Sequence, residues 1–206
     1  MLLAIHPKDP EPRKIRTVVE ALLKGGVVVC PTDTVYAFVC SSQSARAIEA
    51  VTRLKGVKAQ KADLSLICQD LSQLSTYAKA VDTASFRIMK KALPGPYTFI
   101  VQASNEIPKL FKNNRRNVGI RVPNHPIPQA LVKELGHALV VTSVHDPDKV
   151  VDYTTDPERI HEHIGHQVDM VIDGGIGGLL GSTVIDLSNG EPTVLREGKG
   201  EVDGLL

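Results

Sequence analysis

The sequence predicts a soluble α/β domain, and three observations support this fold class. Stretches in which apolar residues recur at helical spacing alternate with short strand-like runs along the chain, which is typical of α/β proteins. Several strand-like runs are apolar throughout, as expected for strands that are covered on both faces. A chain of 206 residues with 42% hydrophobic residues can bury a substantial core in one domain, or in two small ones.

The first two elements are well marked. Apolar residues from Ile15 to Leu23 recur at helical spacing, and Gly25 and Gly26 then end the predicted helix. A strand over residues 27–30 follows at once. Pro31 closes this strand, because proline cannot donate to the hydrogen-bond ladder of a sheet.

Later elements continue the alternation. Helical spacing is found, in order, over residues 45–54, 71–80, 83–93, 127–135 and 157–164. Strand-like runs are found over residues 64–68, 97–101, 118–122, 139–143, 168–172 and 183–187. The only candidate domain break is residues 146–149, and we interpret it as a surface loop. The pattern does not fix the order of the strands in the sheet.

Composition excludes several classes of protein. The net charge of +1 does not indicate a nucleic-acid-binding protein, although it is compatible with a local basic cavity. The lack of tryptophan and an aromatic content of 4% argue against base-stacking platforms for single strands. No stretch reaches the length of a membrane span, and the N-terminus is too short for a signal peptide. We therefore expect a cytoplasmic protein that does not associate with membranes.

Neither the cysteines nor the histidines predict a metal site. Cys30, Cys40 and Cys68 lie in or beside apolar runs without metal-like spacing, so we expect small core residues in a reducing compartment. His161 and His163 would point to nearly opposite sides of a helix. A structural or solvated histidine cluster is therefore favoured over a metal centre.

Residues 31–36 (PTDTVY) are the most informative stretch for function. Thr32, Asp33, Thr34 and Tyr36 place two hydroxyls, a carboxylate and a phenol directly after a predicted strand. Open α/β sheets usually bind ligands at strand ends, so this stretch indicates a binding site. The alternative is a polar turn in which Asp33 caps a backbone group.

Five further short motifs follow in order, at residues 94–99 (PGPYTF), 119–126 (GIRVPNHP), 142–145 (TSVH), 181–186 (GSTVID) and 195–198 (LREG). Each is weak alone, but together with the first motif they resemble the YrdC/YciO family of threonylcarbamoyl-AMP synthase-like proteins. The resemblance runs from about residue 19 to residue 200. Residues 65–72 (SLICQDLS) and the Arg-Glu-Gly ending are most similar to the YciO branch.

The resemblance implies a single YrdC-like domain over residues 1–206. Its expected fold is a twisted sheet of mixed parallel and antiparallel strands, with flanking helices around a deep concave cavity. Longer family members carry a second, smaller domain after this one, and we expect none here because the chain stops at Leu206.

The resemblance also implies a reaction. Threonine, bicarbonate and ATP give threonylcarbamoyl-AMP and pyrophosphate, and the product serves the modification of adenosine in tRNA. A carbamate oxygen attacks the α-phosphate, so the enzyme needs no covalent nucleophile. It must orient three ligands and stabilise growing negative charge, with Mg²⁺ on the phosphates. The sequence accordingly contains neither a convincing catalytic triad nor a Walker-type phosphate loop.

The substrate pocket implied by the resemblance begins at Thr34, the threonine-binding position, which Thr32 and Tyr36 flank. Arg121 matches the residue that holds the threonine carboxylate. A buried arginine is costly unless it is paired, so an anionic ligand is a sensible partner. A structural salt bridge is the alternative. Ser182 matches a threonine-pocket residue, or is simply a hydroxyl at a strand start.

The resemblance also implies a nucleotide site. Lys55 occupies the first position of the family's Lys-x-Arg motif, whose two cations hold the nucleotide phosphate and the small carboxylate substrate. The expected arginine is Val57 in a gapless register, and a one-residue insertion would let Lys58 take its place. The alternative is a solvated basic turn at a helix end. Four other positions match nucleotide contacts, namely Asn117, Ser143, His145 and Arg196.

Three departures from the family pattern bear on activity. Besides Val57, Ala37 replaces the usual glycine after Tyr36, and His145 replaces an asparagine. These changes leave open a weaker activity or a different amino-acid substrate. They also leave open whether Lys58 replaces the missing arginine.

Two other functions compete with the synthase. A non-catalytic module of the same fold could bind tRNA or double-stranded RNA through basic residues, with candidates Arg87, Lys90, Lys91, Lys112, Arg115 and Arg116. Such runs are more often simply solvated. A sugar-phosphate lyase rests on fold analogy alone, and its expected cluster of acidic metal ligands is not evident in the sequence.

Overall fold

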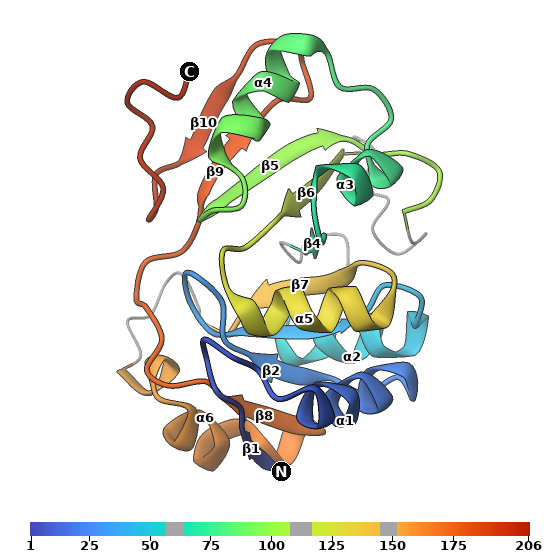
Figure 1. The fold of residues 1–206 in the computed structure, drawn as a ribbon, viewed down its shortest axis with the longest axis vertical. Helices are drawn as coiled ribbons and strands as arrows, with labels where there is room; N and C mark the ends of the chain where they lie inside the picture. Colours follow the sequence, from blue (N-terminus) through green and yellow to red (C-terminus); the bar gives the residue numbers. More distant parts are fainter. Residues whose placement is uncertain (57–63, 108–116, 145–151) are drawn as a thin grey trace.

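One sheet of mixed direction runs through the whole molecule (Figure 1). This computed structural model describes residues 1–56, 64–107, 117–144 and 152–206. Within them, ten strands follow one another across the sheet as β1 (Leu2–Ala4), β8 (Met170–Asp173), β2 (Val28–Cys30), β3 (Ala37–Ser41), β7 (Leu139–Ser143), β4 (Ser65–Ile67), β6 (Asn117–Arg121), β5 (Tyr97–Gln102), β9 (Thr183–Asp186) and β10 (Thr193–Arg196). The pairs β1–β8, β8–β2, β4–β6 and β5–β9 are parallel, and the other neighbours are antiparallel.

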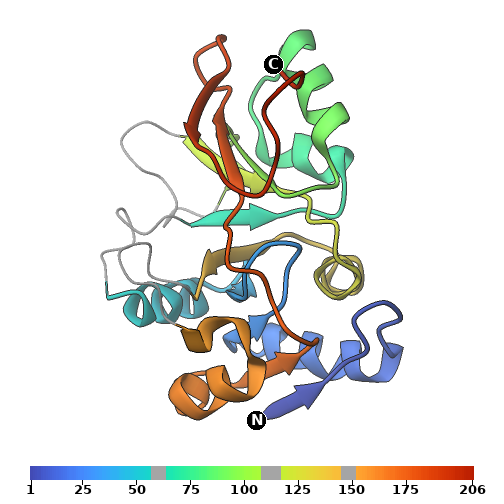
Figure 2. The ribbon, with the colours of Figure 1, turned by 90° about the vertical axis from the view of Figure 1, so that its left-hand side faces the viewer.

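The helices pack into two hydrophobic clusters. Helices α1 (Pro12–Leu23) and α5 (Pro126–Leu135) contribute to one cluster and lie side by side. The other cluster receives side chains from α2 (Ala45–Leu54), α3 (Leu71–Tyr77), α4 (Thr83–Ala92) and α6 (Pro157–Ile164). In Figure 2, α2 lies on one side of the central strands, and α1 and α5 lie on the other.

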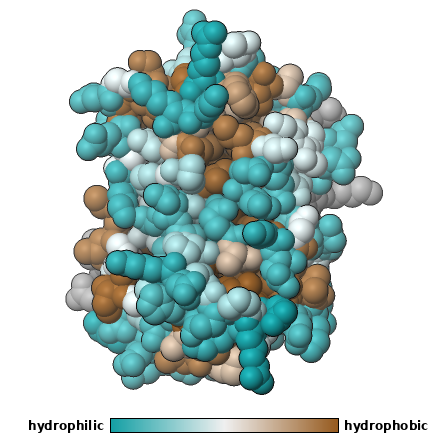
Figure 3. Space-filling model, in the orientation of Figure 1, coloured by the Kyte–Doolittle hydropathy of each residue, from teal (hydrophilic) through white to brown (hydrophobic). Residues whose placement is uncertain are grey.

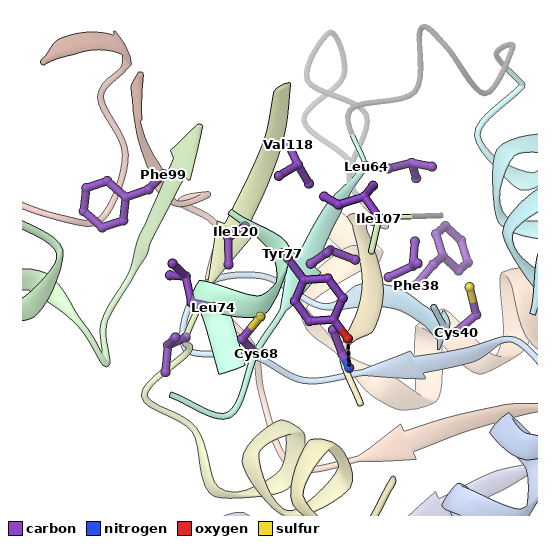
Figure 4. Close-up of a cluster of buried hydrophobic side chains, with 14 of the residues drawn as sticks. Phe38, Cys40, Leu64, Cys68, Leu74, Tyr77, Phe99, Ile107, Val118 and Ile120 are labelled. Carbon is purple, nitrogen blue, oxygen red and sulfur yellow. Dashed lines mark hydrogen bonds between the residues drawn. The ribbon is translucent and has the colours of Figure 1, made fainter. Parts of the chain in front are cut away.

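Alternate residues along a strand contribute their side chains to the two different clusters. In β2 and the residue before it, Val27 and Val29 join the cluster of α2, whereas Val28 and Cys30 join the cluster of α1 and α5. The expectation that these apolar runs are covered on both faces is therefore confirmed. Figure 4 shows the cluster that α2, α3, α4 and α6 join, in which Tyr77 is buried and its hydroxyl oxygen accepts a hydrogen bond from Ala138 N at 3.2 Å.

The predicted elements agree closely with the structure. Strand β7 and helices α2 and α6 have the predicted bounds, and the other predicted strands and helices are present with ends shifted by a few residues. Helix α1 begins at Pro12 rather than Ile15, because proline is favoured in the first turn, where its missing N–H costs nothing. Helix α3 ends at Tyr77 instead of residue 80, since Ala78 leaves the helix to form a β-bridge with Ala103.

Strands β1, β3 and β10 were not predicted from the sequence. Strand β1 has three residues and β10 is largely exposed, so both edge strands lack a strong apolar pattern. The loop predicted at residues 146–149 lies outside the described residues. No helix in the described ranges is both long and apolar enough to cross a membrane.

The three cysteines are reduced core residues, as predicted. Each has no exposed surface, and burial raises the pKa of every thiol, to about 12 for Cys40 and Cys68. We expect native protein at pH 8 to react hardly at all with dithionitrobenzoate, because only the thiolate attacks. All three thiols should react after unfolding in guanidinium chloride. Rapid reaction of any thiol in the native protein would contradict this packing.

Candidate functional site

The polar residues after β2 form a loop that its own hydroxyls hold in place. The Thr32 hydroxyl donates to Val35 O at 2.7 Å and accepts from Thr34 N at 3.1 Å. The two threonine hydroxyls lie 3.0 Å apart, and both residues are buried. Hydrogen bonds of this kind stabilise tight polar turns, so Thr32 and Thr34 reach the site in fixed positions.

Arg121 reaches this loop from the end of β6. Its Nη2 donates to Asp33 Oδ1 at 2.9 Å and to Thr34 Oγ1 at 3.0 Å. Alternation along β6 explains the direction of the side chain. Val118 and Ile120 point into the cluster around α2, so Arg121 points to the other face.

The electrostatics of Arg121 favour an anion. The Arg121 and Asp33 side chains are each 8% exposed, so the ion pair is almost completely desolvated. Burial lowers the pKa of Arg121, nearby Asp33 opposes that shift, and the positive charge of Arg196 adds to it. Within the described ranges, Arg121 Nε is buried without a hydrogen-bond partner. A buried guanidinium with an unused donor and a neighbouring cation suits a negatively charged ligand.

Ser182 and Arg196 form the next part of the site. The Ser182 hydroxyl lies 2.7 Å from the Thr98 hydroxyl of β5. Arg196, at the end of β10, donates from Nη2 to Ser182 O at 3.0 Å and to Ser182 Oγ at 3.4 Å. The family resemblance implied that Ser182 binds the amino acid and that Arg196 binds the nucleotide. The structure places these two residues in contact.

Lys199 brings a further cation to the loop. Its backbone N donates to Gly181 O at 2.8 Å, which fixes the position of the Lys199 backbone. Its Nζ then reaches Asp33 O at 2.5 Å. Sequence reasoning missed Lys199, and it missed Asp33 as the partner of Arg121, because both contacts join residues far apart in the chain.

Tyr36 anchors the segment that leads from β8 to β9. Its hydroxyl donates to Gly175 O at 2.7 Å and accepts from Gly174 N at 3.2 Å. Burial raises the pKa of Tyr36, so the phenol stays protonated. Further along the segment, Gly178 N donates to Thr34 O at 3.0 Å, and a Cβ at Gly178 would lie only 2.4 Å from that oxygen.

Lys55 and Ser143 are also brought together. Lys55 caps the end of α2, and its Nζ donates to Ser143 O at 3.1 Å. Ser143 ends β7 and pairs with Ala37, the buried first residue of β3, so it lies close to the 31–36 loop. Asn117 begins β6, of which Arg121 is the end, and its Nδ2 donates to Ser188 Oγ at 2.9 Å.

Several predicted positions fall outside the described residues. These are Lys58 and His145, together with Val57 and the basic residues Lys112, Arg115 and Arg116. Of the remaining basic residues, Arg87 and Lys90 are exposed on α4, and Lys91 Nζ donates to Gly204 O. Where the structure describes the chain, no three His, Cys, Asp or Glu side chains are grouped as metal ligands. His163 instead stacks on Tyr153, with ring centroids 4.2 Å apart.

The buried ion pair generates a stability prediction. Replacing Asp33 with asparagine should lower the free energy of unfolding by about 3 kcal/mol, because it leaves the Arg121 charge buried without a counter-ion. Lys14→Gln is the matched control, since the Lys14–Glu11 pair is well exposed and its loss should cause no measurable change. Urea unfolding of both variants checks this. Equal effects of the two substitutions would contradict the importance of the buried pair.

Comparison with known proteins places the chain among relatives of nearly the same length. The family model Sua5/YciO/YrdC, described as "Telomere recombination", matches residues 20–198. The uncharacterized protein YciO of Escherichia coli (strain K12) is 42% identical over 204 residues, which cover 98% of this chain and 97% of that protein. The crystal structure of E. coli YciO superposes with a TM-score of 0.92 at 41% identity, covering 100% of this chain and 99% of that one.

Relatives with a named activity are more distant. A human protein named threonylcarbamoyl-AMP synthase is 31% identical over 207 residues, covering 95% of this chain and 72% of that protein. The crystal structure of P. abyssi Sua5 complexed with L-threonine has a TM-score of 0.87 at 26% identity, covering 96% of this chain and 57% of that one. The predicted mixed α/β fold is confirmed by these similarities.

Proposed function

The chain belongs to the Sua5/YciO/YrdC family, and on that premise we propose that it is a threonylcarbamoyl-AMP synthase-like nucleotidyltransferase. Its substrates are threonine or a similar amino acid, bicarbonate and ATP, and its products are threonylcarbamoyl-AMP and pyrophosphate. The activated group serves the modification of adenosine in tRNA in the cytoplasm. Relatives named threonylcarbamoyl-AMP synthase support this assignment.

One observation carries the proposal, namely the buried guanidinium of Arg121 beside the Thr34 hydroxyl. A guanidinium fork with an unused N–H matches the carboxylate of an amino acid. The hydroxyls of Thr34, Thr32 and Ser182 offer both donors and acceptors, which suits a hydroxyl-bearing side chain such as that of threonine. The solved complex of Sua5 with L-threonine adds support from a relative of the same fold.

Charge explains the nucleotide part of the proposal. Lys55 and Arg196 approach the 31–36 loop from different elements, and each is held by a backbone oxygen, of Ser143 and Ser182 respectively. Cations placed around a phosphate stabilise the charge that develops as pyrophosphate leaves. We propose that Lys55, with Lys58, acts in this step, and that Asn117, Ser143 and His145 contribute to nucleotide binding.

We further propose that ATP enters with Mg²⁺. Mg²⁺ usually retains water and is held by substrate phosphates with one or two carboxylates, so the protein needs no dedicated cage of acidic ligands.

Pyrophosphate release tests the proposal. Wild-type protein, ATP, bicarbonate and Mg²⁺ are incubated with each amino acid in turn, and release should depend on threonine. Arg121→Lys should reduce this release at least about tenfold, because lysine keeps the charge but loses the planar fork. Lys55→Ala should reduce it by at least as much. Arg87→Lys, on the exposed side of α4, is the control and should retain full activity.

The other outcomes are equally informative. Release that requires a different amino acid keeps the reaction and corrects the substrate. No release with any amino acid contradicts the proposed enzyme. If such an inactive protein still binds tRNA or double-stranded RNA with an affinity that falls steeply with salt, the non-catalytic RNA-binding module is the better assignment.

A further inference from the structure

A cavity of about 560 Å³ opens between α3, the loop after α4 and the start of α5. Figure 3 shows hydrophobic residues gathered in a hollow on this face. The lining includes none of Thr34, Arg121, Ser182 or Lys55. The cavity is therefore distinct from the candidate site, and its volume lies within the range of small-molecule sites.

The cavity and the candidate site share a carboxylate. Asp33 Oδ2 accepts from Asn124 N at 2.9 Å, and Asn124 lines the cavity. Asp33 Oδ1 accepts from Arg121 on the side of the candidate site. The cavity and the candidate site are therefore neighbours that both contact Asp33.

The walls of the cavity are mainly apolar. They come from three separate parts of the chain, and the apolar residues are Leu71, Leu93, Pro94, Val122, Pro123 and Pro126. The three prolines are rigid rings, and apolar walls of this kind contact the faces of a planar ligand. Binding such a ligand would remove apolar surface from water at little cost in side-chain entropy.

The polar groups of the cavity are hydrogen-bonding but carry little charge. Asp70 uses Oδ1 to cap α3, accepting from Gln73 N at 2.8 Å, and its other oxygen makes no hydrogen bond to a described residue. The carboxamides of Gln69 and Asn124 likewise make none within the described part of the chain. His125 Nδ1 accepts from Ile127 N, and burial lowers the pKa of the imidazole, so it is neutral.

The charges of the lining select the ligand. Among the described residues, no lysine or arginine lines the cavity and Asp70 is the only carboxylate, so phosphates and carboxylates are disfavoured. A carboxylate accepts from exocyclic amino groups, and carboxamides offer a donor next to an acceptor, which matches the edge of a nucleobase. We propose that this cavity binds the base of an uncharged nucleoside, whose exocyclic amino group donates to Asp70.

Calorimetric titration with phosphate-free guanosine, adenosine, cytidine and uridine tests this proposal. Nucleosides with an exocyclic amino group should bind at least about tenfold more tightly than uridine, which lacks one. Asp70→Asn should remove most of that preference while keeping the helix cap, because asparagine caps helices as well as aspartate. Asp82→Asn changes the equivalent cap of α4 outside the cavity and should leave binding unchanged.

Three results would overturn the proposal. The first is no saturable binding of any of the four nucleosides up to millimolar concentration. The second is the same preference in Asp70→Asn as in wild type, with both variants folded by circular dichroism. The third is displacement of bound cytidine by inorganic triphosphate, which has no base and would therefore place the nucleoside in the candidate nucleotide site. The outcome does not depend on pyrophosphate release, so it stands apart from the proposed function.

Discussion

The buried pair of Arg121 and Asp33 is the interaction on which the site depends. It joins the end of β6 to the loop between β2 and β3, two parts of the chain separated by 88 residues. A desolvated guanidinium must have a counter-charge, so the loop cannot move away from the strand without a large energetic cost. The same pair leaves Arg121 Nε without a hydrogen-bond partner among the described residues, and our proposal of an anionic substrate builds on this unused donor.

The second constraint is the segment between β8 and β9. Its two strands lie second and ninth across the sheet, so the chain must pass along the molecule before β9 can pair with β5 (Figure 2). Close contact with Tyr36 and Thr34 requires glycine, because a side chain at Gly177 or Gly178 would overlap them. The crossing then positions Ser182, and β10 returns Arg196 and Lys199 to the same place.

Much of the fold could be predicted from the sequence, because apolar periodicity reports which faces are buried. Strand β3 was not predicted, because its five residues, AFVCS, follow the polar motif of residues 31–36 without a turn signal. The ordered motifs indicated Thr34 and Arg121, which the structure brings into contact. Local patterns could not reveal that Asp33 is the counter-ion of Arg121 or that Lys199 reaches Asp33, since both are contacts between distant segments.

The central claim is that Arg121 is the carboxylate receptor of an amino-acid site. A crystal structure of the protein with L-threonine, ATP and bicarbonate tests it most directly. We expect the threonine carboxylate within about 3 Å of the Arg121 guanidinium, with the threonine hydroxyl near Thr34 or Ser182. An amino acid bound elsewhere, with Arg121 contacting only Asp33 and Thr34, would show that Arg121 does not bind the carboxylate and that the ion pair is purely structural.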